Sequence, residues 1–313
     1  MRYAIGVDLG GTNIAVGLVD ENFNIVDKVS VPTNAPRPAE EIVKDMAAAA
    51  AELAERNNVQ PVGIGIGSPG IISGGVVLSA ANLKFRDVPL CDMLEKVSGL
   101  KCALGNDANV AALGENAVGS GKDASSFVMV TLGTGVGGGI IEGGKIVEGF
   151  NGAGAEIGHF LLYPGGRQCG CGKKGCFEAY CSASGLIQDT KDAMAAHPES
   201  AIARLCEGDP EKINGKTAFD AMREGDATGK SVVDTYIYNL ALGVSNIMVL
   251  LQPEILAIGG GISREGETLL APLREVAYAN SYFDETTPRT KIVAATLRGD
   301  AGIVGAAALI LND

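Results

Sequence analysis

The chain contains two copies of one pattern, in which a short apolar strand meets a glycine-rich turn and a second strand follows. The first copy is GVDLGGTNIAVGLVD (6–20) and the second is MVTLGTGVGGGIIEG (129–143). In both copies Leu-Gly follows the Asp or Thr near the end of the first strand. Such internal similarity predicts an α/β fold of two related lobes, each with a glycine-rich hairpin.

Hydrophobic periodicity predicts alternating strands and helices in both halves of the chain. The expected strands are 3–7, 14–20, 25–31, 62–67, 101–104, 127–131, 254–263 and 291–296. The expected helices are 39–56, 89–97, 108–117, 183–196, 230–251, 268–279 and 301–311, and we expect the last to return to the first lobe. The predicted division is a small lobe of residues 1–107, with 300–313 packing back on it, and a large lobe of 108–299.

Charge and hydropathy limit the partners of the chain. The net charge is -12 and there is no basic run, so nucleic acid and anionic membrane surfaces are poor partners. The start MRYAIGVDLGGTN is too short and too interrupted for a signal peptide. We also expect that no apolar run reaches membrane-spanning length. These features predict a cytoplasmic protein with no membrane and no nucleic-acid partner.

One imidazole and three thiols crowd the segment between residues 152 and 178. The four residues are His159, Cys169, Cys171 and Cys176. This Cys₃His set suits tetrahedral zinc, and four protein ligands predict a structural rather than a catalytic metal. A redox-active thiol cluster is the alternative, but the histidine and the lack of a thioredoxin-like setting disfavour it. The remaining cysteines have no metal spacing, so we expect buried structural thiols at Cys91, Cys102, Cys181 and Cys206.

The glycine turns are candidate phosphate sites. GTGVGG (133–138) fits G-x-G-x-x-G, but the dinucleotide version requires a helix directly afterwards, and here IIEGGKIVEG follows. No Walker loop is present. Two hairpin loops therefore remain as candidates, one in each copy of the pattern, and the loop in the second copy spans 132–139. Their N–H groups can surround phosphate oxygens. Ordinary tight turns are the alternative.

A series of motifs resembles the ROK family of sugar kinases, and within it the bacterial glucokinases. These motifs are Asp8-Leu9-Gly10-Gly11-Thr12, Gly67-Ser68-Pro69-Gly70, Asn82-Leu83, Asn106-Asp107-Ala108-Asn109, Leu132-Gly133-Thr134-Gly135, Glu156-Ile157-Gly158-His159 and the Cys-Gly-Cys-Gly-x-x-Gly-Cys loop. The resemblance extends from about residue 3 to the last helix. It implies an actin-like (ribonuclease H-like), duplicated two-lobe ATPase fold with a sugar cleft between the lobes. It also implies ATP and Mg²⁺, a hexose 6-phosphate as product, and a homodimer.

Asp107 is the candidate general base, because it follows a strand and starts a helix and can accept the proton of a sugar hydroxyl. A simple helix N-cap is the alternative for Asp107, and the resemblance favours the base. Asp8 lies in the first glycine turn, where a carboxylate needs a cation such as Mg²⁺ between itself and phosphate. A turn-stabilising aspartate is the alternative for Asp8.

The resemblance implies two further groups of site residues. The sugar-binding set is Gly67, Asn82, Asn106, Asp107, Glu156, His159 and Glu178. The ATP-binding set is Asp8, Gly10, Gly11, Thr12, Asn13, Thr134, Gly135, Gly260 and Gly261. From the residues alone, Asn82 and Glu178 are equally consistent with polar loop residues, and His159 with a purely structural zinc ligand.

The sequence departs from the family pattern at three positions. Ala155 stands where the family usually has glycine, Phe85 where many of its glucokinases have tryptophan, and Asn13 where lysine is frequent. The leading hypothesis is ATP-dependent phosphorylation of glucose to glucose 6-phosphate. The alternatives are a kinase for N-acetylmannosamine, N-acetylglucosamine or fructose, and a sugar-sensing protein without turnover, which would need neither Asp8 nor Asp107. A zinc hydrolase is excluded because the metal has no open coordination position.

Overall fold

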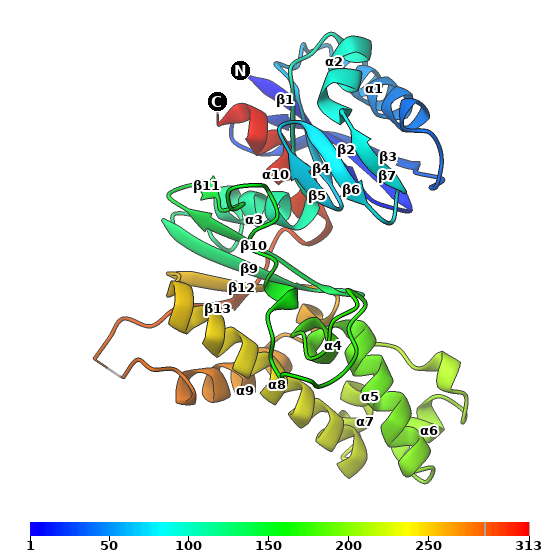
Figure 1. Ribbon diagram of the computed structural model, residues 1–313, viewed down its shortest axis with the longest axis vertical. Helices are drawn as coiled ribbons and strands as arrows, with labels where there is room; N and C mark the ends of the chain where they lie inside the picture. The colour runs from blue at the N-terminus through cyan, green and yellow to red at the C-terminus, as the bar shows by residue number, and fades with distance from the viewer. Residues whose placement is uncertain (285, 313) are drawn as a thin grey trace. The chain divides into compact units, whose positions relative to one another are not determined.

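The computed structural model describes residues 1–284 and 286–312, and the chain forms two compact units. The first unit comprises Met1–Met129, Gly139–Ala155 and the segment from Thr296 onwards. The second comprises Val130–Gly138 and Glu156–Ala295. The chain therefore passes between the units four times, and Figure 1 follows its elements from the blue N-terminus to the red C-terminus.

Two five-stranded sheets share one topology. Their strand orders are β3-β2-β1-β4-β8 and β11-β10-β9-β12-β13. In the first sheet β1, β2 and β3 form an antiparallel meander, while β1, β4 and β8 run parallel. In the second, β10 and β11 are antiparallel and β12 and β13 are parallel. Position for position the two orders correspond, which confirms the duplication predicted from the repeated glycine hairpins.

The strands of these sheets, in chain order, are β1 (Tyr3–Leu9), β2 (Asn13–Asp20), β3 (Ile25–Pro32), β4 (Ile64–Ser68), β8 (Cys102–Asn106), β9 (Ser126–Leu132), β10 (Val136–Glu142), β11 (Lys145–Ile146), β12 (Ile255–Gly260) and β13 (Lys291–Ala294). A third, antiparallel sheet consists of β5 (Ile71–Ser73), β6 (Val76–Ala80) and β7 (Phe85–Val88). The helices are α1 (Ala39–Arg56), α2 (Leu90–Ser98), α3 (Asp107–Val118), α4 (Glu178–Cys181), α5 (Ala183–Ala196), α6 (Ala201–Leu205), α7 (Thr217–Arg223), α8 (Ala227–Leu251), α9 (Glu267–Ala279) and α10 (Ala301–Leu311).

In the first unit, alternate residues of β1 face two different helices. Ile5, Val7 and Leu9 join the core that includes the buried face of α1, whereas Ala4 packs with the C-terminal helix α10. Helix α10 lies close to the sheet, because a Cβ at Gly65 of β4 would stand 1.7 Å from the carbonyl oxygen of Ala306. The predicted return of the last helix to the first lobe is therefore confirmed.

Helix α10 also packs tightly against α3. A Cβ at Gly305 would lie 1.7 Å from the backbone oxygen of Val110, so only glycine allows this approach. Helix α3 carries Asp107 at its first position. Helix α10 packs against β1, the strand that carries Asp8 near its end. The two helices thus fix the backbone on which the candidate catalytic carboxylates stand.

The core helix of the second unit is α8, which contacts α4, α5, α6, α7 and α9. It is long and apolar enough to cross a membrane by length and composition, so the expectation that no apolar run reaches that length is wrong for this helix. Two thirds of its most apolar window is buried within the protein, including Tyr236 and Leu240. Burial of this kind is what a core helix requires.

Several elements differ from the sequence prediction. Strand β10 begins at Val136, so the second glycine loop is shorter than the predicted 132–139. Within this strand Gly139 packs closely on α3, where a Cβ would lie 2.6 Å from the Cβ of Ala112. The sheet of β5–β7 and the short helices α6 and α7 were not predicted.

The division into a small lobe of 1–107 with 300–313 and a large lobe of 108–299 stays a prediction. The compact units assign α3 and the hairpin 139–155 to the first body instead.

Candidate active site

Three parallel strands of the first unit end side by side and bring predicted site residues to one edge. In the register of the sheet, Asp8 of β1 lies opposite Gly67 of β4, and Ser68 lies opposite Asn106 of β8. Asp107 follows Asn106 directly as the first residue of α3. The carboxyl edge of parallel strands is where open α/β sheets bind ligands.

The first glycine turn is held in shape by its own backbone and by Thr33. The Gly10 N–H donates to the Asn13 carbonyl oxygen at 2.9 Å, and the Thr33 hydroxyl donates to the Gly10 carbonyl at 2.7 Å. A Cβ at Gly11 would lie 3.5 Å from the Cβ of Asn82, so the predicted sugar ligand Asn82 stands against this turn. Thr12 and Asn13 are exposed at its tip. Thr33 was not predicted, because only the folded hairpin brings it to the turn.

The N-cap of helix α3 is Asn106 and not Asp107. The Asn106 side-chain oxygen accepts from the N–H groups of Ala108 and Asn109, at 3.0 and 3.2 Å, and its amide nitrogen donates to the Gly70 carbonyl. The alternative interpretation of Asp107 as the helix cap is therefore wrong. The Asp107 carboxylate accepts from the adjacent Ala108 N–H at 2.8 Å. Burial raises the pKa of Asp107 above its ordinary value of 3.8.

Asp8 is a second half-buried carboxyl group at this edge. Burial, followed by the negative charge of Asp107, raises the pKa of Asp8 from 3.8 to about 6. The Asp8 side chain packs on the start of α10, where a Cβ at Gly302 would stand 2.7 Å from its carboxyl carbon. Two neighbouring carboxylates in a desolvated site suit a divalent cation, because a cation offsets both their repulsion and their burial.

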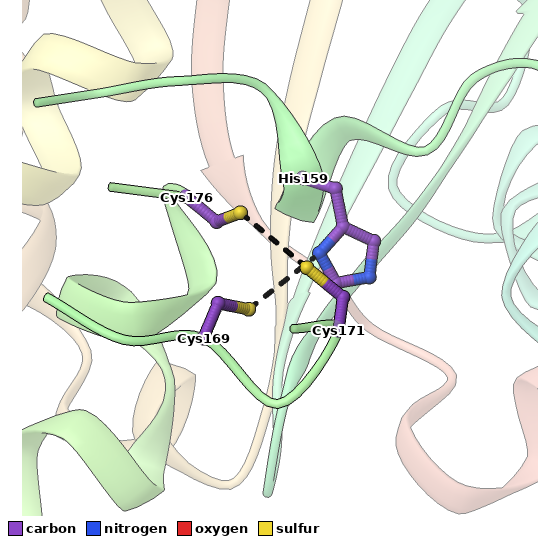
Figure 2. A group of neighbouring side chains, drawn as sticks. All are labelled: His159, Cys169, Cys171 and Cys176. Atoms are coloured by element: carbon purple, nitrogen blue, oxygen red, sulfur yellow. Dashed lines mark hydrogen bonds between the residues drawn. The ribbon is translucent and has the colours of Figure 1, made fainter. Parts of the chain in front are cut away.

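In the second unit, His159 and the three cysteines converge on one point, and the potential ligand atoms all lie within 4.8 Å of one another (Figure 2). The Cys171 and Cys176 sulfurs are 3.6 Å apart, and the Cys169 sulfur is 3.8 Å from His159 Nδ1. Zinc bonds of about 2.3 Å to sulfur and about 2.0 Å to nitrogen place tetrahedral neighbours about 3.5–3.8 Å apart. The donor set and its spacing therefore fit zinc.

Figure 2 also shows which nitrogen of His159 is available for a second partner. Nδ1 faces the thiol groups, and the other ring nitrogen points away from the three sulfurs. The backbone N–H of His159 donates to the Glu156 carbonyl at 3.0 Å, which closes the short 3₁₀ turn Ile157–His159. This turn places Glu156 and His159 next to each other on the metal loop.

Glu178 joins the metal loop to the second glycine loop. One of its carboxylate oxygens accepts from the Val136 N–H at 3.0 Å, and the other lies 3.3 Å from the Cys169 sulfur. A Cβ at Gly135 would stand 2.4 Å from the same carboxylate, so glycine is required there. The interpretation of Glu178 as a solvated loop acid is therefore wrong.

The second glycine loop is tied to the start of helix α5. The Ala183 N–H donates to the Gly133 carbonyl and the Ser184 hydroxyl to the Thr134 carbonyl, both at 2.8 Å. Gly133 and Val136 already use their own N–H groups within the protein. Phosphate donors in this loop are thus expected at Thr134 and Gly135.

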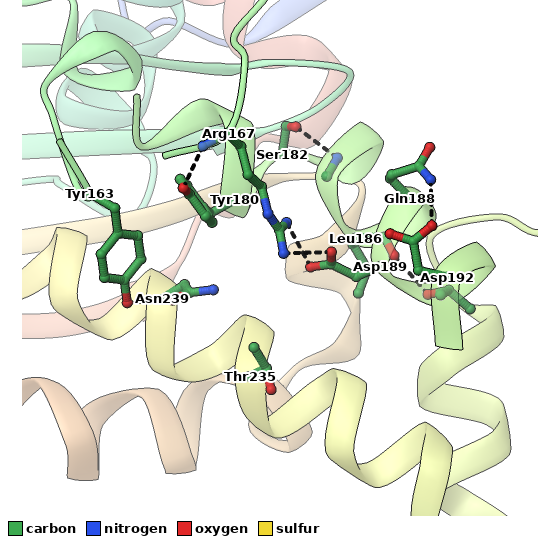
Figure 3. Close-up of polar contacts among 12 residues, drawn as sticks. Tyr163, Arg167, Tyr180, Ser182, Leu186, Gln188, Asp189, Asp192, Thr235 and Asn239 are labelled. Atoms are coloured by element: carbon green, nitrogen blue, oxygen red, sulfur yellow. Dashed lines mark hydrogen bonds and ion pairs between the residues drawn. The ribbon is translucent and has the colours of Figure 1, made fainter. Parts of the chain in front are cut away.

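A cluster that the sequence did not reveal anchors the far side of the metal loop (Figure 3). The Arg167 guanidinium forms two contacts with the Asp189 carboxylate of α5, at 3.0 and 2.8 Å, and stacks over the Tyr180 ring. The Tyr163 hydroxyl donates to Asn239 of α8 at 2.8 Å. Such contacts hold the loop from the protein side, independently of any metal. No local spacing marks these residues, since each pair is distant in sequence.

A cavity of about 710 Å³ lies beside this cluster in the second unit. Its walls include Thr134 and Gly135 of the glycine loop, Cys169 of the metal loop, and Ser184 and Gln188 of α5. The cavity gives the second glycine loop an open side, which a plain tight turn packed into the core would lack.

The glycines after β12 have different structural roles. Gly260 has a positive φ of 82°, and a Cβ there would stand 2.3 Å from the Leu132 carbonyl, so packing alone explains it. A Cβ at Gly261 would meet nothing within 4 Å. Of the two, Gly261 is therefore the one that has room for a ligand.

The departures from the family pattern have structural consequences. Ala155 adopts a left-handed backbone with φ of 61°, a conformation that glycine enters without strain. Phe85 is buried in the core of the first unit. Cys91, Cys181 and Cys206 are buried free thiols as predicted, whereas Cys102 is half-buried.

The chain is similar to known proteins over nearly its whole length, and thus over both units. A family model described as the ROK family matches residues 4–313. A glucokinase from Thermotoga maritima is 40% identical over 98% of this chain and 96% of its own length. An N-acetylmannosamine kinase from Yersinia pestis is 32% identical, with 98% of each chain covered. The crystal structure of a ROK family glucokinase from Streptomyces griseus, in complex with glucose and AMPPNP, is 38% identical over 98% of each chain with a TM-score of 0.82.

Proposed function

Because this chain belongs to the ROK family and has its actin-like ATPase fold, we propose that it transfers the γ-phosphoryl group of ATP to the 6-hydroxyl of glucose. The observation that carries this proposal is the pair of half-buried carboxyl groups with raised pKa values, Asp8 and Asp107, at the carboxyl edge of β1, β4 and β8. A hexokinase reaction needs both a proton acceptor and a magnesium ligand. A sugar sensor needs neither.

In this proposal Asp107 accepts the proton of the sugar hydroxyl. Burial raises the pKa of Asp107, and a carboxylate with a raised pKa is a stronger base than an ordinary one. Its neighbour Asn106 caps the helix and leaves Asp107 for the substrate. General-base catalysis of this kind contributes ~10²–10⁴-fold to the rate.

Asp8 would hold Mg²⁺, directly or through its water shell. Bound there, Mg²⁺ supplies positive charge against the phosphate oxygens of ATP. The backbone of Gly10, Gly11, Thr12 and Asn13 forms the adjoining turn for phosphate, and Thr134 and Gly135 form the second. We assign Gly260 to the support of the nucleotide strand and Gly261 to close approach of the nucleotide.

The sugar is held by hydroxyl-binding groups from both glycine-repeat halves. The proposed set is Gly67, Asn82, Asn106, Asp107, Glu156, His159 and Glu178. Carboxylates and amides suit hexose hydroxyls, which both donate and accept hydrogen bonds. The outward nitrogen of His159 would join this set while Nδ1 binds zinc, so that one ring connects metal and substrate.

Zinc would be held by His159, Cys169, Cys171 and Cys176 and would supply structural stability to the loop. With four protein ligands it takes no part in proton or phosphoryl transfer. Its effect on the sugar is indirect, through the position of Glu156, His159 and Glu178.

The lobes that close on the sugar are residues 1–107 with 300–313 and residues 108–299, and closure excludes water from the transferred phosphoryl group. We place the enzyme in the cytoplasm as a homodimer, with ATP and a hexose as its small-molecule partners.

The direct test is ADP release coupled to a reporter enzyme, with glucose, N-acetylmannosamine, N-acetylglucosamine and fructose as acceptors. We expect kcat/KM for glucose to exceed that for each other sugar by about 10-fold or more, the size of discrimination that small pocket differences provide. A higher kcat/KM for N-acetylmannosamine would identify the chain as a kinase of that sugar. Glucose binding without ADP release from any acceptor would establish the sensor and overturn the kinase.

A further inference from the structure

Helix α3 carries a second acidic residue besides Asp107, near its opposite end. The Glu115 side chain is 0% exposed and lies in the last turn of the helix. Negative charge at a helix C-terminus opposes the helix dipole, and burial of a carboxylate is unfavourable without hydrogen bonds. A carboxylate at this place must be compensated by specific partners.

Four hydrogen-bond donors surround the Glu115 carboxylate. Ser120 donates through its N–H at 2.7 Å and its hydroxyl at 2.8 Å. The Leu297 N–H donates at 2.6 Å and the Thr296 hydroxyl at 3.2 Å. A Cβ at Gly119 would stand 2.2 Å from the same carboxylate, so glycine provides its space. The hydrogen bonds of this carboxylate thus form a junction between the end of α3 and a segment near the C-terminal end of the chain.

Thr296 and Leu297 lie where the chain re-enters the first unit. Thr296 is the first residue of the first unit after the chain returns from the second. Helix α10 begins four residues after Leu297, at Ala301. Glu115 therefore fixes the return crossover at the point where it enters the unit that contains Asp8 and Asp107.

Both candidate catalytic carboxylates depend on the two helices that this junction joins. Asp107 is the first residue of α3, and Asp8 packs against Gly302 at the start of α10. Gly114 of α3, one residue before Glu115, faces the Ala301 carbonyl, where a Cβ would stand only 2.5 Å away. A shift of the crossover would move the start of α10 against α3, and with it Asp8 against Asp107.

We propose that Glu115 is a positioning residue for phosphoryl transfer, which locks the return crossover to α3 and so sets the spacing of Asp8 and Asp107. This inference rests on the proposed kinase function. Glu115 touches neither substrate, and its effect belongs to the chemical step, because misplacement of a reacting group by about 1 Å can cost ~10²-fold in rate.

The test compares Glu115→Gln with Asp20→Asn. Glutamine keeps the size of the side chain but replaces one acceptor oxygen with an NH₂ group that faces N–H donors. Asp20 is the matched control, because it is also a buried carboxylate in the first unit and accepts from the N–H groups of Asn22 and Asn24, both at 2.9 Å. Its hydrogen bonds stay within one β-hairpin and do not reach the crossover.

For Glu115→Gln we expect kcat to fall about 10- to 100-fold, in the range that small displacements produce, while the glucose Kd and the ATP KM change less than about threefold. Hydrogen exchange at residues 296–300 should accelerate in the same variant. Asp20→Asn should lower the melting temperature and keep kcat within about twofold. Thr296→Val, which removes a single donor, provides the measurement if Glu115→Gln does not fold, and it should lower kcat without raising the glucose Kd.

The inference is overturned if folded Glu115→Gln, or Thr296→Val in its place, retains wild-type kcat. It is equally overturned if Glu115→Gln and Asp20→Asn lose activity in proportion to their loss of stability. Failure of the kinase function itself would appear in the wild-type enzyme as an absence of ADP release, so the two failures are distinct.

Discussion

Glu178 accepts a hydrogen bond from the Val136 N–H at 3.0 Å, and its second carboxylate oxygen lies 3.3 Å from the Cys169 sulfur. One side chain thus connects the metal loop to the loop proposed to hold phosphate. The Cys₃His cluster and the glycine repeat are separate signals in the sequence, and these contacts join them in the fold.

Glu178→Ala should weaken both substrates, because it removes a proposed sugar ligand and leaves the Val136 N–H without its acceptor. We expect the glucose KM to rise about 10-fold or more and the ATP KM to rise severalfold, as for the loss of charged hydrogen bonds. Steady-state kinetics with each substrate varied will measure both. Glu142→Ala, at an exposed position at the end of β10, is the control and should change neither. An unchanged ATP KM in Glu178→Ala would contradict the coupling of the loops.

Removal of zinc should reduce stability and sugar affinity together. The four ligand atoms close the loop that carries Glu156 and His159, and metal binding contributes to folding free energy. After chelation we expect a lower melting temperature and a glucose KM raised by about 10-fold, with both restored by added zinc. The bound metal can be quantified by mass spectrometry of the native protein. If both properties survive the loss of metal, the loop does not depend on it.

Ala155→Gly should stabilise the protein. A left-handed backbone costs a residue with a Cβ about 1–2 kcal/mol, and the extra entropy of glycine in the unfolded chain offsets part of the gain. The expected net increase in the free energy of unfolding is about 0.5–1 kcal/mol, measured by urea denaturation. Ala153→Gly, two residues earlier at a position without a positive φ, is the control and should not stabilise. Destabilisation by Ala155→Gly would contradict the assigned backbone.

Asp8 should make the magnesium-free protein less stable as pH rises. Its pKa of about 6 in the folded protein exceeds 3.8, so between these values the folded state holds a proton that the unfolded state has lost. Stability is therefore lost as pH rises towards and through about 6. Since one pKa unit corresponds to ~1.4 kcal/mol, Asp8→Asn should gain at most about 3 kcal/mol at pH 7 and little at pH 4.

The measurement is urea denaturation of both proteins at pH 4, 5.5 and 7 in the presence of a magnesium chelator. Asp92→Asn is the control, because Asp92 is exposed in the first turn of α2, where a negative charge is mildly favourable. A gain of stability in Asp8→Asn that is the same at all three pH values would contradict the titration of Asp8.

The sequence predicted those parts of the fold that local patterns determine. The bounds of α1, α5 and α10 agree with the prediction. Helices α1 and α5 have an apolar periodicity, α5 also begins at the Ser182 cap, and α10 is apolar along its whole length. The strands β5–β7 and the helices α6 and α7 were not predicted, because they are too short to show a hydrophobic periodicity. The duplicated strand order followed from the glycine repeat rather than from any single strand.

For the site, the sequence located groups that share a motif but not groups that meet only in the fold. The Cys₃His cluster lies within one loop and was predicted in full. The pairing of Arg167 with Asp189 and of Glu115 with Leu297 joins residues far apart in the chain. The sequence placed the alternative cap of α3 at Asp107, whereas the structure has it at Asn106, because adjacent residues of similar propensity differ only in backbone geometry.

The most direct test of the central claim is the kinetics of Asp107→Asn. Asparagine keeps the shape and hydrogen bonds of the side chain but cannot accept the proton of the sugar hydroxyl. The account predicts a folded protein whose glucose Kd, measured by calorimetry, stays within about threefold, while kcat falls by ~10²–10⁴-fold. A folded Asp107→Asn enzyme that retains kcat within about twofold of wild type would contradict the assignment of Asp107 as the base.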